Sequence, residues 1–197
     1  MSRKIFASLA AVTATLLFTG NANASWVQVS PSNLVITTTS GKNSTTSTIS
    51  YSPAPANQIY FYNGNPGGQS LTNAKTWIST EFNVASAALT EATACAVSNG
   101  AFSCDNGSTM TGASAKSGTL NSTNAFDYLA VHFGGGDLLF HWLSPIKTFS
   151  ISGLPNGLSN VYAFIDPPVS AVPLPAAAWL FGSALLGFTM LSSRKKV

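Results

Sequence analysis

Residues 126–133 read FDYLAVHF, residues 137–143 read DLLFHWL, and three glycines at 134–136 separate the two segments. The first segment alternates apolar and polar residues, and both segments are rich in the aromatic and aliphatic residues that strands favour. Two such segments joined by a short glycine turn predict a β-hairpin.

Further strands are expected on both sides of this hairpin. Residues 147–152 (KTFSIS) and 159–165 (SNVYAFI) are rich in strand-forming residues, so residues 126–165 are predicted to form a four-stranded meander. Upstream, β-branched residues dominate 26–50, and prolines and glycines bound the short apolar segment at 58–62. The sequence therefore predicts a mainly β protein, an antiparallel β-sandwich.

One short amphipathic helix is expected within this β protein. From Leu71 to Leu89, apolar residues recur at spacings of three and four, which places them on one face of a helix. The pattern is clear only to about Thr80, and Ser70 or Thr72 could cap the start. We expect this helix to pack on the sheet rather than to contact a membrane.

The basic residues of the chain are concentrated at its ends. The formal charge of the 197 residues is +3, and five of the nine basic residues are terminal: Arg3, Lys4, Arg194, Lys195 and Lys196. Between Ser25 and Ala171 there are four lysines, six acidic residues and no arginine, for a formal charge of −2. This part of the chain lacks the basic surface that phosphates require, which excludes nucleic acid as a partner.

The N-terminus has the three parts of a secretory signal peptide. An apolar stretch at 5–18 follows the charged start, and Ala22 and Ala24 are small residues at the −3 and −1 positions. Cleavage after residue 24 would make Ser25 the first residue of an exported domain, residues 25–171. An uncleaved anchor is the alternative, but the apolar stretch is short for a span of about 20 residues.

Export would place the two cysteines in an oxidising compartment. Cys95 and Cys104 enclose eight residues with a turn-prone Asn99-Gly100, so we expect a disulfide that closes a hairpin or short loop. Free thiols or half of a metal site are the alternatives, although no second cluster of Cys and His at ligand spacing follows. Residues 98–124 have few large apolar side chains and are expected to form surface strands and loops.

Patterns that indicate catalysis or metal binding are weak. His132 and His141 could form a metal site with Asp137, but a three-glycine turn would place His132 opposite Leu138, and aromatic neighbours favour ordinary strand histidines. No serine lies in the G-x-S-x-G pattern, and the DNG at 105–107 lacks the spacing of a calcium loop. We expect a protein that is not an enzyme and has no cofactor, metal or catalytic residue.

A glycan-binding module is the alternative function. Sugar sites need an exposed aromatic face with amides and hydroxyls nearby, and β-sandwiches can carry them. The candidate aromatic residues are Trp26, Trp77, Trp142, Tyr60, Tyr62 and Tyr128. Most of them are equally suited to the core of a domain of this size.

The C-terminus combines a short motif, an apolar segment and a basic tail. Residues 176–193 contain no charge and are about 27 Å long as a helix, which is enough to cross a membrane. The following Arg194, Lys195 and Lys196 would keep the C-terminus on the cytoplasmic side. The predicted topology places the domain outside and the tail inside.

This C-terminus resembles the sorting signal of the PEP-CTERM class in its VPLPA variant. The resemblance covers residues 172–197 and includes the motif Val172, Pro173, Leu174, Pro175 and Ala176, then the apolar helix and the basic tail. Proteins of this class are exported by Gram-negative bacteria and processed by the membrane enzyme exosortase. The resemblance implies exosortase and the secretion machinery as partners. It also implies contact with the inner membrane through the C-terminal helix before processing.

Together these features predict an exported protein of the cell surface or extracellular matrix. Its β-rich domain would be a non-catalytic structural component, associated with exopolysaccharide or biofilm. Before processing, the domain would be anchored outside the inner membrane by the C-terminal helix. Surface polysaccharide is the expected partner after processing.

Overall fold

The computed structural model describes residues 25–40 and 42–166, which contain eleven strands and one helix. The predicted cleavage residues Ala22 and Ala24, the sorting motif, the transmembrane segment at 176–193 and the basic tail lie outside these ranges. The elements are β1 (Trp26–Val29), β2 (Val35–Ser40), β3 (Asn43–Thr48), β4 (Ser50–Ser52), β5 (Gln58–Asn63), α1 (Leu71–Glu81), β6 (Thr90–Ser98), β7 (Ala101–Cys104), β8 (Thr109–Met110), β9 (Gly118–Phe133), β10 (Gly136–Ser152) and β11 (Leu158–Ile165).

Nine of the strands form one antiparallel sheet in the order β1-β5-β10-β9-β11-β6-β7. Strand β4 pairs with the C-terminal part of β10, and β8 pairs with the N-terminal part of β9. Strands β2 and β3 form a separate antiparallel hairpin. The predicted mainly β, antiparallel architecture with one helix is confirmed.

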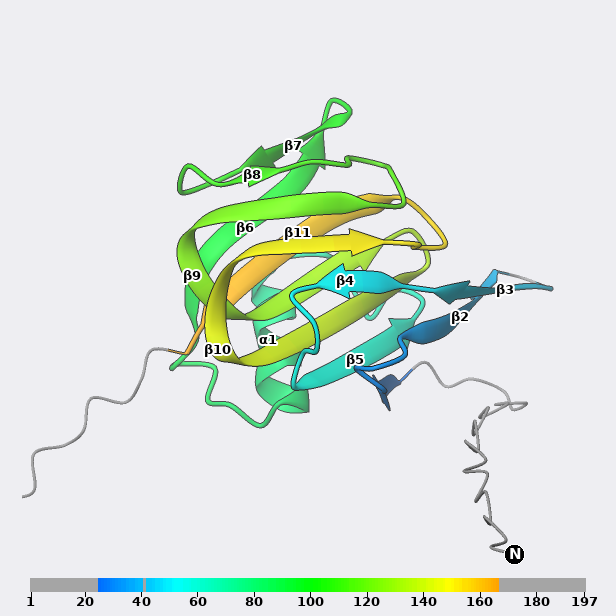
Figure 1. The fold of residues 1–197 in the computed structure, drawn as a ribbon, viewed down its shortest axis with the longest axis horizontal. Helices are drawn as coiled ribbons and strands as arrows, with labels where there is room; N and C mark the ends of the chain where they lie inside the picture. Colours follow the sequence, from blue (N-terminus) through cyan, green and yellow to red (C-terminus); the bar gives the residue numbers. More distant parts are fainter. Residues whose placement is uncertain (1–24, 41, 167–197) are drawn as a thin grey trace, which may run out of the picture.

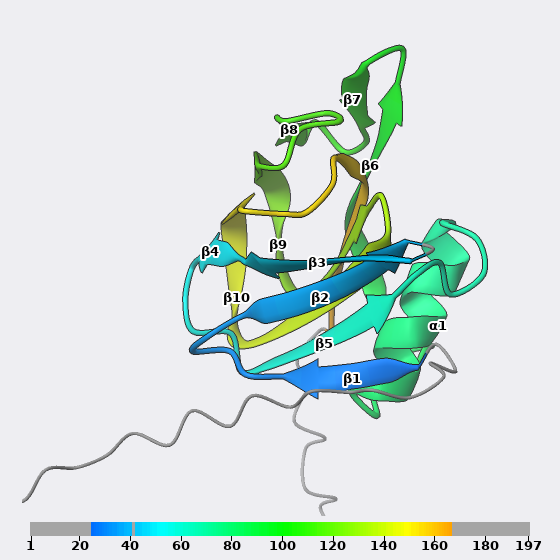
Figure 2. The ribbon, with the colours of Figure 1, turned by 90° about the vertical axis from the view of Figure 1, so that its right-hand side faces the viewer.

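The two longest strands, β9 and β10, bend so strongly that their ends belong to opposite layers (Figures 1 and 2). The β9–β10 register shifts between His141 and Thr148, where β10 contains Pro145. The ring centroids of Phe140 and Phe149 lie 5.1 Å apart, whereas nine residues of straight strand would span about 30 Å. The two layers of this sandwich are therefore continuous through the bent strands. We call first layer the one in which β5 and β11 pair with the β9–β10 hairpin next to its turn. The second layer is the one in which β4 and β8 pair with the opposite ends of β10 and β9.

The space between the layers is filled by large apolar side chains. Inward-facing residues of both halves of β10 meet there, and Phe133, Phe140 and Phe149 are completely buried. Ile36 of β2 and Leu34, the residue before this strand, close the same core. Alternation along each strand sends the intervening residues to the outer faces.

Helix α1 covers the outer face of the first layer, behind the sheet in Figure 1. Ala74 and Ile78 are fully buried against Leu139 and Phe164 of the sheet. The helix begins after Ser70, whose side chain accepts a hydrogen bond from the Asn73 backbone N–H at 3.2 Å. The predicted helix and one of its two predicted caps are thus confirmed.

The predicted four-stranded meander is wrong in two respects. The segments DLLFHWL and KTFSIS belong to one strand, β10, because Pro145 occupies a bend rather than a turn between strands. Strand β11 lies beside β9 rather than beside β10. The chain after β10 therefore crosses β9 before it pairs.

The predicted three-residue turn is also wrong. Phe133 pairs with Gly136, so only two glycines form the turn, and His132 lies opposite Asp137 rather than Leu138. Because a one-residue change in loop length shifts the register, every cross-strand pair differs from that expected.

The predicted disulfide is present and lies between paired strands. Cys95 of β6 and Cys104 of β7 are directly opposite each other, with Cα atoms 4.1 Å apart. The hairpin turns at Asn99-Gly100, and both residues have positive φ angles, of 52° and 78°. In the chain-entropy model, a disulfide that closes a loop of this size stabilises the fold by about 2.5–3 kcal/mol.

The segment at 98–124 consists mainly of exposed or half-buried strands and loops, as expected, and a few of its side chains are buried. Strand β9 already begins at Gly118, and Leu120 is fully buried. Among residues 25–40 and 42–166, no helix is long and apolar enough to cross a membrane.

Candidate functional site: a hydroxyl-lined groove

The outer face of the second layer carries small hydroxyl side chains. Ser150 of β10 lies opposite Ser52 of β4 on one side and opposite Thr119 of β9 on the other. One step along the strands, Ser152 lies opposite Ser50. Neighbouring strands are about 4.8 Å apart and outward residues along a strand about 6.7 Å apart, so these hydroxyls form a grid.

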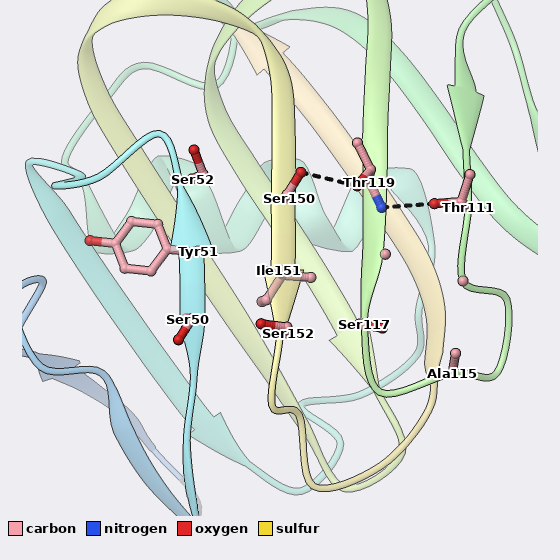
Figure 3. A pocket seen from close by; sticks show the side chains of 12 residues that line it. Ser50, Tyr51, Ser52, Thr111, Ala115, Ser117, Thr119, Ser150, Ile151 and Ser152 are labelled. Atoms are coloured by element: carbon pink, nitrogen blue, oxygen red, sulfur yellow. Dashed lines mark hydrogen bonds between the residues drawn. The ribbon is translucent and has the colours of Figure 1, made fainter.

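A groove of about 590 Å³ lies on this grid (Figure 3). Strands β4, β10 and β9 form its floor, and the segment that follows β8 forms one side. Seven of its twelve lining residues are serine or threonine: Ser50, Ser52, Thr111, Ser117, Thr119, Ser150 and Ser152. None of the lining residues is charged.

Some of these hydroxyls are held in place by the protein and others are free. The Thr119 and Ser150 hydroxyls share a hydrogen bond of 3.0 Å, and the Thr119 backbone N–H donates to Thr111 Oγ1, also at 3.0 Å (Figure 3). Within the described residues, four exposed lining serines make no side-chain hydrogen bond: Ser50, Ser52, Ser117 and Ser152. Each free hydroxyl can donate one hydrogen bond and accept two.

The groove depends on two glycines at the β8–β9 side. A Cβ atom on Gly118 would collide with the Thr111 carbonyl and with Leu158, and one on Gly112 would collide with the Ser117 carbonyl. Gly112 also has a backbone φ of 82°, which residues with a side chain rarely adopt. Any larger residue at these positions would push this wall of the groove away.

The groove contains hydrogen-bonding groups but no means of activating a nucleophile. Among the described residues, no histidine or carboxylate lines it, and these residues provide no general base for its serines. The arrangement is suited to holding an uncharged polar molecule.

The histidines considered for metal binding are separated by the fold. His132 Nδ1 lies 2.8 Å from Asp137 Oδ1, and both side chains are buried. His141 instead stacks on Tyr128, with ring centroids 4.5 Å apart. In the part of the chain that the structure describes, no three metal-ligating side chains gather.

The His132–Asp137 pair is buried on the face that α1 covers. Burial raises the pKa of Asp137, while the hydrogen bond and the charge of His132 lower it, and the net shift is upward. Asp137 Oδ2 is buried and has no hydrogen-bond partner within the described residues. The histidine is therefore the main polar support of this carboxyl group.

The aromatic residues proposed for sugar binding divide into two groups. Trp142 and Tyr128 are buried, at 5 % and 7 % exposure. Trp26 lies 5.2 Å from Tyr62 and 5.7 Å from Trp77 between ring centroids, and these three are half-buried at the edge formed by β1, β5 and α1. We call these three residues the aromatic edge; Tyr60 is also half-buried.

A pair of carboxyl groups lies beside the disulfide hairpin. A hydrogen bond with Asp105, followed by burial, raises the pKa of Glu91 to about 7. Burial would raise the pKa of Asp105, but hydrogen bonds with Glu91, the Ala94 backbone and Thr93 outweigh burial and lower it. Glu91 is therefore partly protonated near neutral pH, beside a carboxyl group of Asp105 whose pKa is lowered.

The hydroxyl-lined groove was not predicted from the sequence, although a signal for it exists. The segments TISYS at 48–52 and KTFSIS at 147–152 alternate hydroxyl residues with other residues. With a period of two, such segments place their hydroxyls on one face of a sheet. The strand pairing that brings these segments together was needed to find the site.

Comparisons of the chain with protein-family models, curated proteins and solved structures found no match.

Proposed function

We propose that this protein is an exported, non-catalytic component of the cell surface or extracellular matrix. Its β-rich domain is delivered across the inner membrane, anchored by the C-terminal helix and released by exosortase at the VPLPA-type motif. It then associates with exopolysaccharide. The topology and the sorting step come from the sequence resemblance at residues 172–197.

The observation that carries export is the disulfide. Cys95 and Cys104 are the only cysteines of the chain, and they lie directly opposite each other in the β6–β7 hairpin. Structural disulfides persist in oxidising compartments and are rare where thiols are kept reduced. A cross-strand disulfide therefore supports the proposal that the domain is exported to an oxidising compartment.

A matrix role is supported by the surface of the domain. Residues 25–171 have no arginine and a formal charge of −2, and hydroxyl side chains coat the second layer. Such a surface favours hydrogen bonding with uncharged polar polymers over binding of nucleic acid or phosphate.

Mass spectrometry of the protein from its native host tests delivery and processing. We expect an N-terminus at Ser25, a C-terminus near the motif at 172–176, and a Cys95–Cys104 linked peptide under non-reducing conditions. A mature pool that retains Arg194, Lys195 and Lys196 would refute processing and leave an anchored protein. Free thiols in that pool would argue against export.

A glycan-binding module with an aromatic-lined site is the second candidate. The observation that favours it is the aromatic edge, where Trp26, Tyr62 and Trp77 are half-buried and close together. These rings pack mainly on one another and on the core beneath α1, which leaves little of their faces for a sugar.

A further inference from the structure

We propose that the hydroxyl-lined groove is a binding site for an uncharged polysaccharide chain. The inference rests on the proposed function for the kind of polymer that the protein meets. It adds the place of contact and the chemical class of the ligand, and it places that contact on the second layer rather than at the aromatic edge.

The free hydroxyls provide the first argument. Ser50, Ser52 and Ser152 are exposed, open into the same groove and make no side-chain hydrogen bond within the described residues. The hydroxyls of a sugar both donate and accept, as serine hydroxyls do, so the two surfaces are complementary in any hydroxyl orientation. A ligand with only donors or only acceptors would use only part of this capacity.

The absence of charge in the groove provides the second argument. None of the twelve lining residues is charged, so a uronic acid, sulfate or phosphate would find no cation to offset its loss of water. A cationic amine would likewise find no carboxylate. The lining therefore selects against charged polymers and accepts neutral ones.

The shape of the groove provides the third argument. Its floor is a sheet face on three strands, with outward positions about 4.8 Å apart across strands and about 6.7 Å apart along them. Paired strands hold these positions rigidly, and the hydrogen bond between Thr119 and Ser150 orders the centre. A volume of about 590 Å³ is within the range of small-molecule sites, large enough for a short segment of a sugar chain.

The test measures retention of the full chain on immobilised polymers. The protein is purified in a polyoxyethylene detergent, which carries no sugar headgroup that could compete. Dextran and galactomannan are the neutral probes, and alginate is the acidic comparison. We expect the wild-type chain to bind at least one neutral polymer and not to bind alginate.

Removal of three groove hydroxyls should abolish most of this binding. The variant S50A/S52A/S152A loses three potential hydrogen bonds, which corresponds to about tenfold or more in affinity. A matched control, T37A/S44A/T46A, removes three exposed hydroxyls from the β2–β3 hairpin and should bind as the wild type does. The variant S50T/S52T/S152T keeps the hydroxyls and should restore binding, and the Tm of each variant verifies folding.

Several outcomes would overturn the proposal. These are unchanged binding by S50A/S52A/S152A, equal loss in the β2–β3 control, retention only on alginate, or no retention of the folded wild-type chain. Loss of binding in Trp77→Ala, with full binding by the groove variant, would place the sugar at the aromatic edge instead. The termini and disulfide measured by mass spectrometry are unaffected by all of these results, so export and groove binding fail separately.

Discussion

The two outer faces of the sandwich differ in almost every chemical property, although the same two strands contribute to both. On the first layer, His132, Asp137 and Leu139 of β9 and β10 are buried on the face that α1 covers, and Leu139 packs with Ala74 and Ile78 of the helix. On the second layer the same strands present Thr119 and Ser150 to solvent or to the groove. The contrast teaches that burial of large side chains on one face allows the other face to carry small polar side chains that the fold does not need for its core.

The largest loss of stability, on the face that α1 covers, is expected from His132→Ala. The substitution leaves the Asp137 carboxyl group buried and without its hydrogen-bond partner, and breaking such a pair costs about 3–5 kcal/mol. Urea unfolding at pH 7 would measure the loss. The double variant H132F/D137L should recover most of it, because apolar side chains need no partner there; a loss under 1 kcal/mol in His132→Ala would contradict the role of the pair.

A somewhat smaller loss of stability is expected when the packing of α1 on the same face is weakened. Ile78 is fully buried between α1 and the sheet, so Ile78→Ala should lower the free energy of unfolding by about 2–4 kcal/mol. Thr76→Ala, on the exposed side of α1, should change it by no more than about 0.5 kcal/mol. Similar losses in the two variants would show that the helix does not seal this face.

A pH dependence of the free energy of unfolding is expected from Glu91. The hydrogen bond with Asp105 and burial raise the pKa of Glu91, and the charge of Lys75 in α1 offsets part of this rise. The folded state holds a proton on Glu91 up to pH about 7, whereas the unfolded chain releases it near its ordinary value of about 4.3. The stability contributed by this proton is therefore complete below about pH 4.3 and is lost as pH rises through about 7.

Glu91→Gln should remove this dependence, so that urea unfolding changes less between pH 4.5 and 7.5 than in the wild type. Lys75→Met should raise the pKa of Glu91 further and move the loss to higher pH. Parallel pH profiles for wild type and Glu91→Gln would contradict the raised pKa of Glu91.

The smallest change in stability is expected on the hydroxyl-bearing face. Ser50→Ala, Ser52→Ala and Ser152→Ala remove exposed hydroxyls without partners in the described residues, so each should shift the free energy of unfolding by no more than about 0.5 kcal/mol. Thermal unfolding of the single variants would measure this. Losses as large as those on the helix-covered face would remove the distinction between the two faces.

Local patterns in the sequence were sufficient for several elements. Periodicity located α1, the Ser70 side chain marked its start, and the spacing of Cys95 and Cys104 around Asn99-Gly100 predicted the disulfide hairpin. Each of these features depends on residues close together in the chain. The mainly antiparallel β class also followed from local composition and alternation.

Features that depend on distant residues were not accessible in this way. Pro145 reads equally well as a turn between two strands or as a bend within one, and only the partners β4 and β5 decide between them. The groove combines residues from 50 to 152, so no single segment contains it. The turn length at 134–136 was ambiguous because three glycines allow several registers.

The position of β11 has a mechanical consequence. This strand is the last described element, and it is hydrogen-bonded to β9 on one side and to β6 on the other. Tension applied beyond Asp166 and directed along β11 would load both ladders in shear, so many hydrogen bonds would have to break together. Among the described strands β1 pairs with β5 alone, at the sheet edge, so a pull of the same size on β1 would meet one ladder. A domain tethered through its C-terminal side would therefore resist stretching best at the point of attachment.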